Sequence, residues 1–255
     1  MGAIFLAGYD AADYGTKVGG DYDGLYPGVP DETAAAVRKI AELAIEHAPA
    51  GVLEFGIGTG RLAFGVDRRG IRVVGIDGSE EMIEQLRSKP DNGAVETVVG
   101  DYRDTTLGER FGVVVLAFNG IMDPRGIRAQ LDIFANAAGH LIPAGYFIVE
   151  SWVMNDAQRR GDWSIVPRFV GNEHVELQLA RYDLATNGID RTLVHLLPDG
   201  IKFLTVADVY TSPEALDVMA EVSGFDRVSR HATWGGAPFT ATSANHITVY
   251  QLRTN

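Results

Sequence analysis

The chain has no cysteine among its 255 residues, and this absence removes several kinds of chemistry at once. Disulfide bonds, thiolate nucleophiles and zinc sites with cysteine ligands are all excluded from the protein itself. Long apolar runs are missing as well, so we expect no membrane partner. The start of the chain lacks the basic flank and the long apolar stretch of a secretion signal, which favours a cytoplasmic location.

Positive charge is scarce too, because 22 lysines and arginines face 34 aspartates and glutamates and leave a formal net charge of −12. A protein with this balance repels a polyanion, and no run rich in lysine or arginine offers a local basic patch. We therefore expect no nucleic-acid partner. The acids and histidines show no spacing like H-E-x-x-H or a facial triad, so the sequence predicts no metal site.

What the chain does contain is an alternation of short apolar runs with helical patterns. The runs are GVLEFG, IRVVGID, VETVVGD, FGVVVLAF and AGYFIVES, and two further strand patterns near the end are DRVSRH and HITVYQL. Apolar runs of this length that are separated by helices are typical of a parallel sheet covered on both faces. We therefore expect a doubly wound α/β domain over residues 31–255, built on a mostly parallel seven-stranded sheet.

Two segments depart from this alternation. Residues 1–30 are rich in tyrosine, aspartate and glycine with little periodicity, which is typical of an irregular arm or lid. Within an insertion at about residues 152–211, three segments predict successive antiparallel strands, namely FVGNEHVELQLARYDL, IDRTLVHLLP and IKFLTVADVYT. We expect these strands to form a cap over the carboxyl-terminal edge of the main sheet.

The stretch VLEFGIGTGRLA places Gly56, Gly58 and Gly60 at alternate positions, directly after an apolar run that contains Glu54. Glycine allows positive φ and lets another molecule approach the main chain closely, and the first strand-to-helix turn of an open parallel sheet normally lines the ligand. The spacing G-x-G-x-G differs from the G-x-G-x-x-G of dinucleotide-binding folds. This difference disfavours an NAD(P)-dependent oxidoreductase, which we keep as an alternative.

Two more acids end neighbouring apolar runs: Asp77, which Gly78 follows, and Asp101. A carboxylate can accept hydrogen bonds from both vicinal hydroxyls of a ribose. Asp77 is therefore the candidate partner of a ribose at the same edge of the sheet as the glycines.

With these motifs the chain resembles the class I S-adenosylmethionine-dependent methyltransferases. LEFGIGTGR is similar to their glycine motif, GDYRD to their adenine-side loop and HLIPAGYFIVE to the motif on their fifth strand. DYDGLYPGVPD, AFNG and PFTATSANHITVY look most like bacterial small-molecule methyltransferases of natural-product type, a set that includes enzymes acting on amino groups of nucleotide-linked sugars. The resemblance implies a Rossmann-like fold and S-adenosyl-L-methionine as the cofactor.

The resemblance also implies a cofactor site. In it the glycines pass under the methionine part of the cofactor, and Glu54 helps to hold the ammonium group. Met82 covers one face of the adenine, which Asp101 and Tyr102 border, and Phe118 faces the sulfonium. The full set of implied cofactor contacts is Tyr14, Glu54, Gly56, Gly58, Gly60, Asp77, Gly78, Met82, Asp101, Tyr102 and Phe118.

Methyl transfer is an in-line displacement in which the cofactor carries the reactivity, so the protein mainly aligns and desolvates. Alignment lowers the activation barrier by about 7–11 kcal/mol. A general base contributes less, because it raises the rate by roughly 10²–10⁴-fold. The candidate catalytic residues are Tyr22, Asn119, Glu150 and His195. Tyr22 would close over the sulfonium, Asn119 and Glu150 would orient or deprotonate the acceptor, and His195 would serve as a base. Each of three candidates has a structural alternative. Tyr22 could only pack the arm, Glu150 could be a solvated acid at a strand end, and His195 could be a structural histidine.

The sequence thus predicts methyl transfer to a nitrogen or oxygen of a small-molecule acceptor, held under a lid made by the arm and the cap. The alternative from another class is a protein that keeps the cofactor site but uses it for other chemistry or for binding alone, because a fold does not fix a function. A homodimer is the assembly that we expect if the chain is not a monomer.

Overall fold

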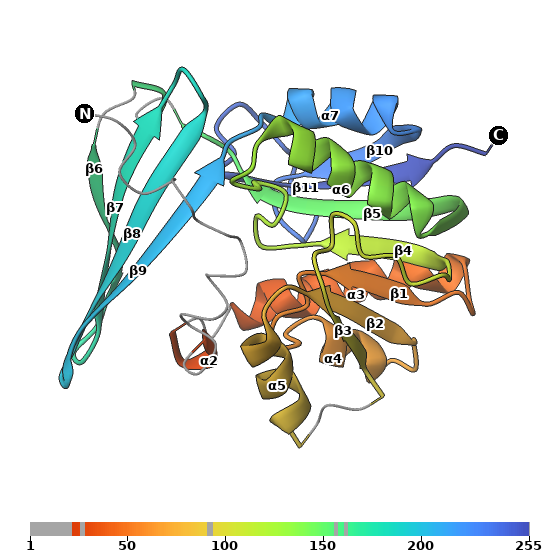
Figure 1. The fold of residues 1–255 in the computed structure, drawn as a ribbon, viewed down its shortest axis with the longest axis horizontal. Coiled ribbons are helices and arrows are strands. Elements are labelled where there is room, and N and C mark those ends of the chain that lie inside the picture. The colour runs from red at the N-terminus through yellow and green to blue at the C-terminus, as the bar shows by residue number, and fades with distance from the viewer. Residues whose placement is uncertain (1–21, 26–28, 91–93, 156–157, 161–162, 255) are drawn as a thin grey trace.

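A computed structural model describes residues 22–25, 29–90, 94–155, 158–160 and 163–254 (Figure 1). Its strands form two sheets, one of seven strands in the order β10-β11-β5-β4-β1-β2-β3 and one of four strands in the order β6-β7-β8-β9. The main sheet consists of β1 (Val52–Phe55), β2 (Val73–Asp77), β3 (Glu96–Val99), β4 (Phe111–Leu116), β5 (Leu141–Trp152), β10 (Phe225–His231) and β11 (Asn245–Leu252). Neighbours among β1 to β5 are parallel, whereas β11 runs antiparallel to β5 and β10 antiparallel to β11. The predicted seven-stranded sheet is confirmed.

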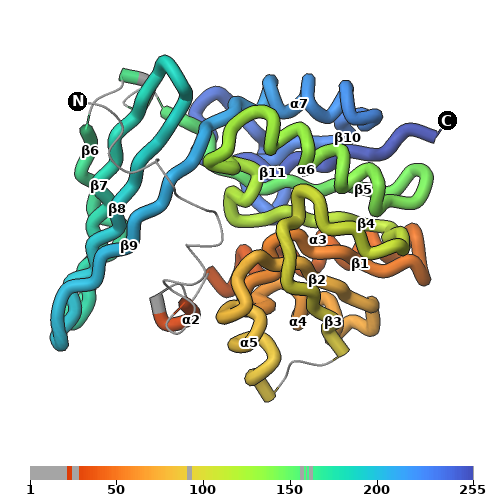
Figure 2. Tube along the Cα trace, viewed as in Figure 1, coloured from red at the N-terminus to blue at the C-terminus, as the bar shows by residue number. Residues whose placement is uncertain are grey.

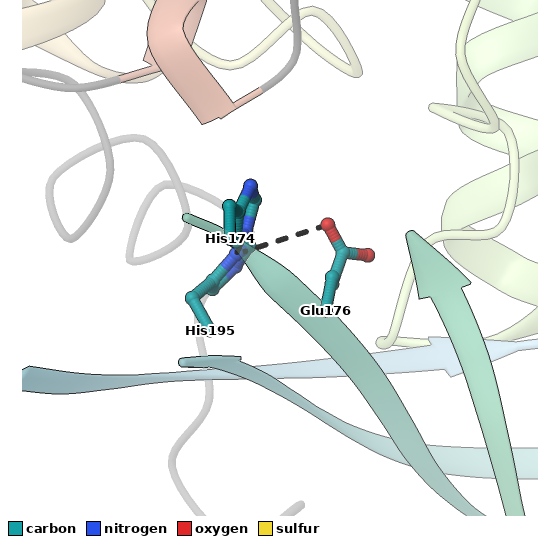
Figure 3. A group of neighbouring side chains, drawn as sticks. All are labelled: His174, Glu176 and His195. Carbon is teal, nitrogen blue, oxygen red and sulfur yellow. Dashed lines mark hydrogen bonds and ion pairs between the residues drawn. The ribbon is translucent and has the colours of Figure 1, made fainter. Parts of the chain in front are cut away.

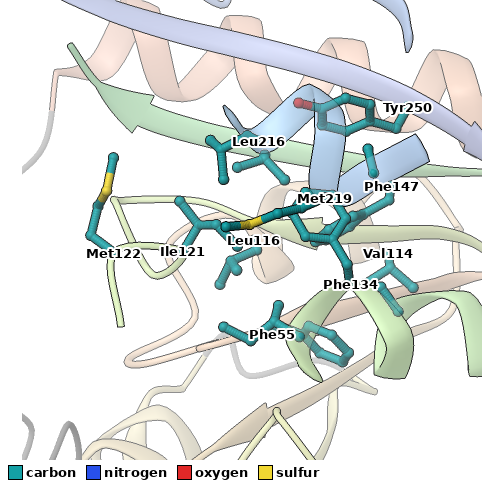
Figure 4. Close-up of a cluster of buried hydrophobic side chains, with 14 of the residues drawn as sticks. Phe55, Val114, Leu116, Ile121, Met122, Phe134, Phe147, Leu216, Met219 and Tyr250 are labelled. Atoms are coloured by element: carbon teal, nitrogen blue, oxygen red, sulfur yellow. The ribbon is translucent and has the colours of Figure 1, made fainter. Parts of the chain in front are cut away.

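Helices cover both faces of this sheet, as the strand patterns predict. The covering helices are α3 (Pro30–Glu46), α4 (Ala63–Asp67), α5 (Glu80–Ser88), α6 (Ile127–Gly139) and α7 (Pro213–Val222). Alternate residues of one strand enter two different cores: Val114 and Leu116 pack with α6 and α7, and Val113 and Val115 pack with α3 and α4. Figure 4 shows the first of these cores. Strands that are apolar on both faces therefore require the doubly wound arrangement.

The order of strands reverses beside β1, which has β2 on one side and β4 on the other. In open α/β sheets, ligands bind outside the carboxyl ends of the strands at such a switch point. The turns after β1 and β4 are therefore where the fold favours a ligand.

The second sheet is the cap, formed by β6 (Ser164–Val170), β7 (Val175–Asp183), β8 (Gly188–Leu197) and β9 (Gly200–Val209). All of its neighbouring strands are antiparallel, and it stands beside the carboxyl ends of β1 and β4 (Figures 1 and 2). The prediction of a single strand from Phe169 to Leu184 is wrong. β6 ends at Val170, and the backbone N–H of Gly171 donates to the carbonyl of His174 at 2.8 Å, so a tight turn starts a new strand.

Only a short part of the expected arm belongs to the described residues. It contains the helix α2 (Tyr22–Leu25), which lies between the cap and α5 (Figure 1). Tyr14 lies outside the described residues. Among the helices that the structure describes, none combines the length and the apolar character needed to cross a membrane.

Candidate active site

The turn after β1 exposes main chain to open space. Gly56, Gly58 and Gly60 have φ values of +66°, +54° and +86°, which L-residues rarely adopt. A Cβ on Gly58 would meet no atom within 4 Å, and one on Gly56 would meet only Tyr102 at 3.7 Å. A Cβ on Gly60 would instead stand 2.7 Å from Phe64 of α4. The first two glycines therefore leave room for a ligand, whereas the third permits close packing of the following helix.

Two carboxylates border this turn. Glu54 lies in the middle of β1 with 5% of its surface exposed, and burial raises its pKa to about 8, although the nearby positive charge of Arg61 acts in the opposite direction. Asp77 ends β2, and its two oxygens accept hydrogen bonds of 2.8 Å from the backbone N–H groups of Gly58 and Ser79. The glycine turn and the end of β2 are thus linked through a carboxylate.

Asp101 and Tyr102 follow β3, which is the neighbour of β2 in the main sheet. Burial acts to raise the pKa of Asp101, but hydrogen bonds from Arg103 and Arg125 leave it below its usual range. The ring of Tyr102 stacks on Phe55 with the centroids 5.8 Å apart, and its hydroxyl donates to the carbonyl of Gly120. Asp101 is therefore an ionised residue already engaged by two arginines.

The turn after β4 carries backbone strain. Phe118 and Asn119 have φ values of 55° and 68°, a conformation that costs a non-glycine residue about 1–3 kcal/mol. The main chain of β5 and the Glu150 side chain hold this turn: the N–H of Phe118 donates to Glu150 Oε2 at 3.0 Å, and Asn119 Oδ1 accepts from the N–H of Trp152 at 2.9 Å. The strained turn presents the Phe118 ring with 46% of its surface exposed.

Arg61 is a site residue that sequence reasoning missed, although a basic residue directly after the third glycine was its signal. Its guanidinium carbon lies 3.4 Å from the centroid of the Phe118 ring. Burial lowers the pKa of Arg61, while the neighbouring Tyr22, Glu150 and Glu54 act to raise it. Glu150 is fixed in turn by the indole N–H of Trp234, which donates to its Oε1 at 2.9 Å. A cation near the carboxylates of Glu54 and Glu150 thus stands between the glycine turn and the end of β5.

Two cavities meet at Phe118. One of about 340 Å³ is bordered by Arg61, Glu150 and Trp234. The other, of about 310 Å³, lies between the main sheet and the cap. Its wall on the main-sheet side includes Tyr102, Phe118, Asn119 and Asp123, and its wall on the cap side includes Arg168, Glu176, Gln178, Arg191 and Asp208. Tyr22 of α2 borders it as well. The second cavity therefore faces a polar surface that the cap supplies.

The helix α2 is fastened to the site at two points. Tyr22 packs with Met82 of α5 and with Leu193 of the cap. Asp23 accepts a hydrogen bond of 2.6 Å from the hydroxyl of Thr59, in the glycine turn, and forms an ion pair of 2.6 Å with Lys89. The described part of the arm thus joins the cap, α5 and the glycine turn.

His195 lies within the cap, fully buried. Its Nδ1 is 3.0 Å from His174 Nε2 and 3.8 Å from Glu176 Oε2 (Figure 3). Burial lowers the pKa of His195, with Glu176 acting in the opposite direction. Because Glu176 rather than His195 borders the cavity, any influence of His195 on an acceptor passes through its neighbours.

Residues 52–145 match the family model described as a methyltransferase domain. Over 96% of this chain and 100% of the other, the structure is similar to that of the CcbJ methyltransferase from Streptomyces caelestis, with a TM-score of 0.87 and 31% identity. The chain belongs to the class I S-adenosylmethionine-dependent methyltransferases. This confirms the predicted family, fold, cofactor and enzyme class.

Two curated methyltransferases are also similar to this enzyme. The cypemycin N-terminal methyltransferase from Streptomyces sp is 27% identical over 204 residues, which cover 78% of this chain and 82% of that protein. The dTDP-3-amino-3,6-dideoxy-alpha-D-glucopyranose N,N-dimethyltransferase from Streptomyces fradiae is 31% identical over 145 residues, or 55% of each chain. The methyltransferase is therefore of the natural-product type that its motifs resemble.

Proposed function

We propose that the enzyme transfers the methyl group of S-adenosylmethionine to an amine nitrogen of a small, polar acceptor. The observation that carries this proposal is the cavity of about 310 Å³ in which Tyr22 and Asn119 face the polar surface of the cap. The names of the curated relatives support nitrogen as the target, because those proteins are an N-terminal methyltransferase and an N,N-dimethyltransferase.

The residues around the glycine turn fit the cofactor. Gly56 and Gly58 leave a space that a Cβ would narrow, and Asp77 at the end of β2 offers carboxylate oxygens for the ribose hydroxyls. Glu54 is a buried carboxylate for which a bound ammonium group would be a counter-charge, and Arg61 suits the methionine carboxylate. When bound, the cofactor supplies an electrophilic methyl group on a sulfonium.

Aromatic rings beside the second cavity suit that sulfonium. Phe118 and Tyr22 both border the acceptor cavity, and cations are attracted to aromatic faces. The strained β4 turn holds Phe118 in place through Glu150, so we assign Glu150 to positioning this ring rather than to proton transfer. Asn119 has its amide carbonyl engaged by Trp152, and we therefore expect it to contact the acceptor through its amide nitrogen.

An acidic group beside the cavity suits an amine acceptor. An alkylamine in water is mostly an ammonium ion at pH 7, because its pKa is about 10. Glu176 borders the cavity and would attract that cation before it releases its proton to water, whereas Asp208 and Asp123 are already paired with Arg191 and Arg125. A neutral amine then needs only alignment with the methyl group, which accords with the small catalytic contribution expected of a general base.

The test is a product assay with deuterated S-adenosylmethionine and matched acceptor pairs. Each pair would consist of a primary amine, such as an amino sugar or a short peptide with a free N-terminus, and its hydroxyl counterpart. Mass spectrometry should find a methylated amine together with S-adenosylhomocysteine, and no product from the hydroxyl partner. Methylation of the hydroxyl partners alone would refute nitrogen as the target. Tight binding of S-adenosylhomocysteine without any methylated product would favour the binding-only alternative.

A further inference from the structure

Three side chains that could bind a metal ion lie close together within the cap, and the family assignment gives none of them a role. Glu176 of β7 and His195 of β8 are direct partners in the antiparallel register, and His174 precedes β7 by one residue. One ligand atom from each of the three side chains lies within 4.8 Å of the others. Figure 3 shows the three side chains pointing toward one another.

The separations of these atoms resemble those around a four-coordinate metal ion. Zinc binds imidazole nitrogen and carboxylate oxygen at about 2.0–2.2 Å, so two ligands at a tetrahedral angle stand roughly 3.3–3.6 Å apart. Here His195 Nδ1 is 3.0 Å from His174 Nε2 and 3.8 Å from Glu176 Oε2. Small movements of the side chains would bring all three atoms to bonding distance of one ion.

We propose that His174, Glu176 and His195 form a binding site for a divalent transition-metal ion of the zinc type. Two imidazoles and one carboxylate are a ligand set that zinc uses with a fourth position open. Glu176 also borders the cavity between the main sheet and the cap, so an ion held by these residues would lie next to the acceptor.

One neighbour of the cluster favours metal binding and another disfavours it. The ring of Phe169 lies 5.3 Å from that of His174 and shields it on the side of β6. Lys202 of β9 is the register partner of His195, and its positive charge opposes a bound cation. The site therefore binds metal more weakly than the same ligands would without Lys202.

We expect the metal ion to help bind the acceptor, an inference that rests on the proposed function. Coordination of the amine itself would occupy the lone pair that attacks the methyl group. With Glu176 bound to the ion, this carboxylate no longer attracts the ammonium group, so the ion would bind a hydroxyl or carboxylate oxygen of the acceptor and leave the amine beside Phe118 and Tyr22. The acceptor class is an amine that carries an oxygen donor elsewhere on the same molecule.

The experiment is metal binding to the untagged, chelator-treated full chain. Cobalt(II) absorption and zinc calorimetry should show one ion bound per chain, with visible bands of a four-coordinate site. His174→Ala and Glu176→Gln should each weaken binding by about 100-fold or more, since even partners outside the ligand set are worth about 10–100-fold. His231→Ala, which removes a histidine of β10 far from this cluster in sequence, is the matched control and should bind like the unchanged chain. Lys202→Met should bind several-fold more tightly.

Binding of S-adenosylhomocysteine to each variant checks that the fold is intact. The metal site is refuted if the unchanged chain binds neither ion at micromolar concentration, or if His174→Ala and Glu176→Gln bind as tightly as the control. A chain that binds metal at this site but methylates no amine would overturn the proposed function and leave the metal site standing.

Discussion

The buried carboxylate of Glu54 makes the stability of the cofactor-free chain depend on pH. Burial raises its pKa from 4.5 to about 8, with Asp77 acting in the same direction and Arg61 in the opposite one. The folded chain therefore keeps a proton that the unfolded chain has lost between these values, so the free energy of unfolding falls as pH rises through this window. Thermal melts at pH 6 and pH 8.5 should show the decrease, and Glu54→Gln should reduce it. Equal pH dependence in both chains would contradict this role.

The same residue links cofactor binding to proton release. An ammonium group beside Glu54 favours the ionised carboxylate, so binding near pH 7 should release up to about one proton per chain. Calorimetry with S-adenosylhomocysteine in two buffers of different ionisation enthalpy measures that number. Glu54→Gln should bind more weakly and release fewer protons. A binding enthalpy that is independent of the buffer for the unchanged chain would contradict the prediction.

Asp77 is expected to contribute most of the ribose affinity. Hydrogen bonds to a charged group are worth about 1.5–3 kcal/mol, so Asp77→Ala should weaken S-adenosylhomocysteine binding by roughly 10- to 100-fold. Because Asp77 also accepts from Gly58 and Ser79, Asp77→Asn is the gentler variant. Glu84→Ala, an exposed acid on α5, is the matched control in calorimetry. Unchanged affinity in Asp77→Ala would remove this residue from the cofactor site.

At the scale of whole elements, α2 is a candidate lid, and the Asp23 side chain connects it to the glycine turn. Asp23 contacts both Thr59 and Lys89, but about half of its side chain is exposed, at 51%. An exposed pair of this kind is worth about 0.2–1 kcal/mol. Asp23→Asn should therefore raise the dissociation constant of S-adenosylhomocysteine only a few-fold, with little change in melting temperature.

The control for this lid contact is Asp31→Asn, in the exposed first turn of α3. Calorimetry on both variants should show weaker binding for Asp23→Asn alone. If the two variants bind equally well, α2 does not act as a lid over the cofactor.

For the whole molecule, cofactor binding should appear as thermal stabilisation. A ligand present at 100 times its dissociation constant adds about 2.7 kcal/mol, and in a chain of this size each kcal/mol raises Tm by about 2–4 °C. S-adenosylhomocysteine should therefore raise Tm by roughly 5–10 °C. NAD⁺ at the same concentration should leave Tm unchanged, and a comparable shift with NAD⁺ would contradict the assignment of the cofactor.

The glycine turn and the acids on the neighbouring strands could be predicted because their signals are local in the sequence. Gly56 and Gly58 are glycines, the residue type that most readily adopts positive φ, and both do so. Glu54 and Asp77 lie on neighbouring parallel strands, whose carboxyl ends meet at one edge of the sheet. The hairpin at Gly171 was missed because a strand-like composition continues on both sides of a tight turn. Arg61 was missed because its position over Phe118 depends on a contact between two different turns.

The sequence by itself determined the family, the doubly wound sheet and the class of cofactor, since apolar periodicity and glycine spacing are properties of short segments. Only the tertiary structure decided that the cap faces the end of β4 with polar side chains, and that His195 meets His174 and Glu176. The pairing of β7 with β8 sets that second arrangement. Strand register depends on turns and on packing between distant segments, and a shift of β7 by one residue would turn Glu176 to the opposite face of the cap from His195.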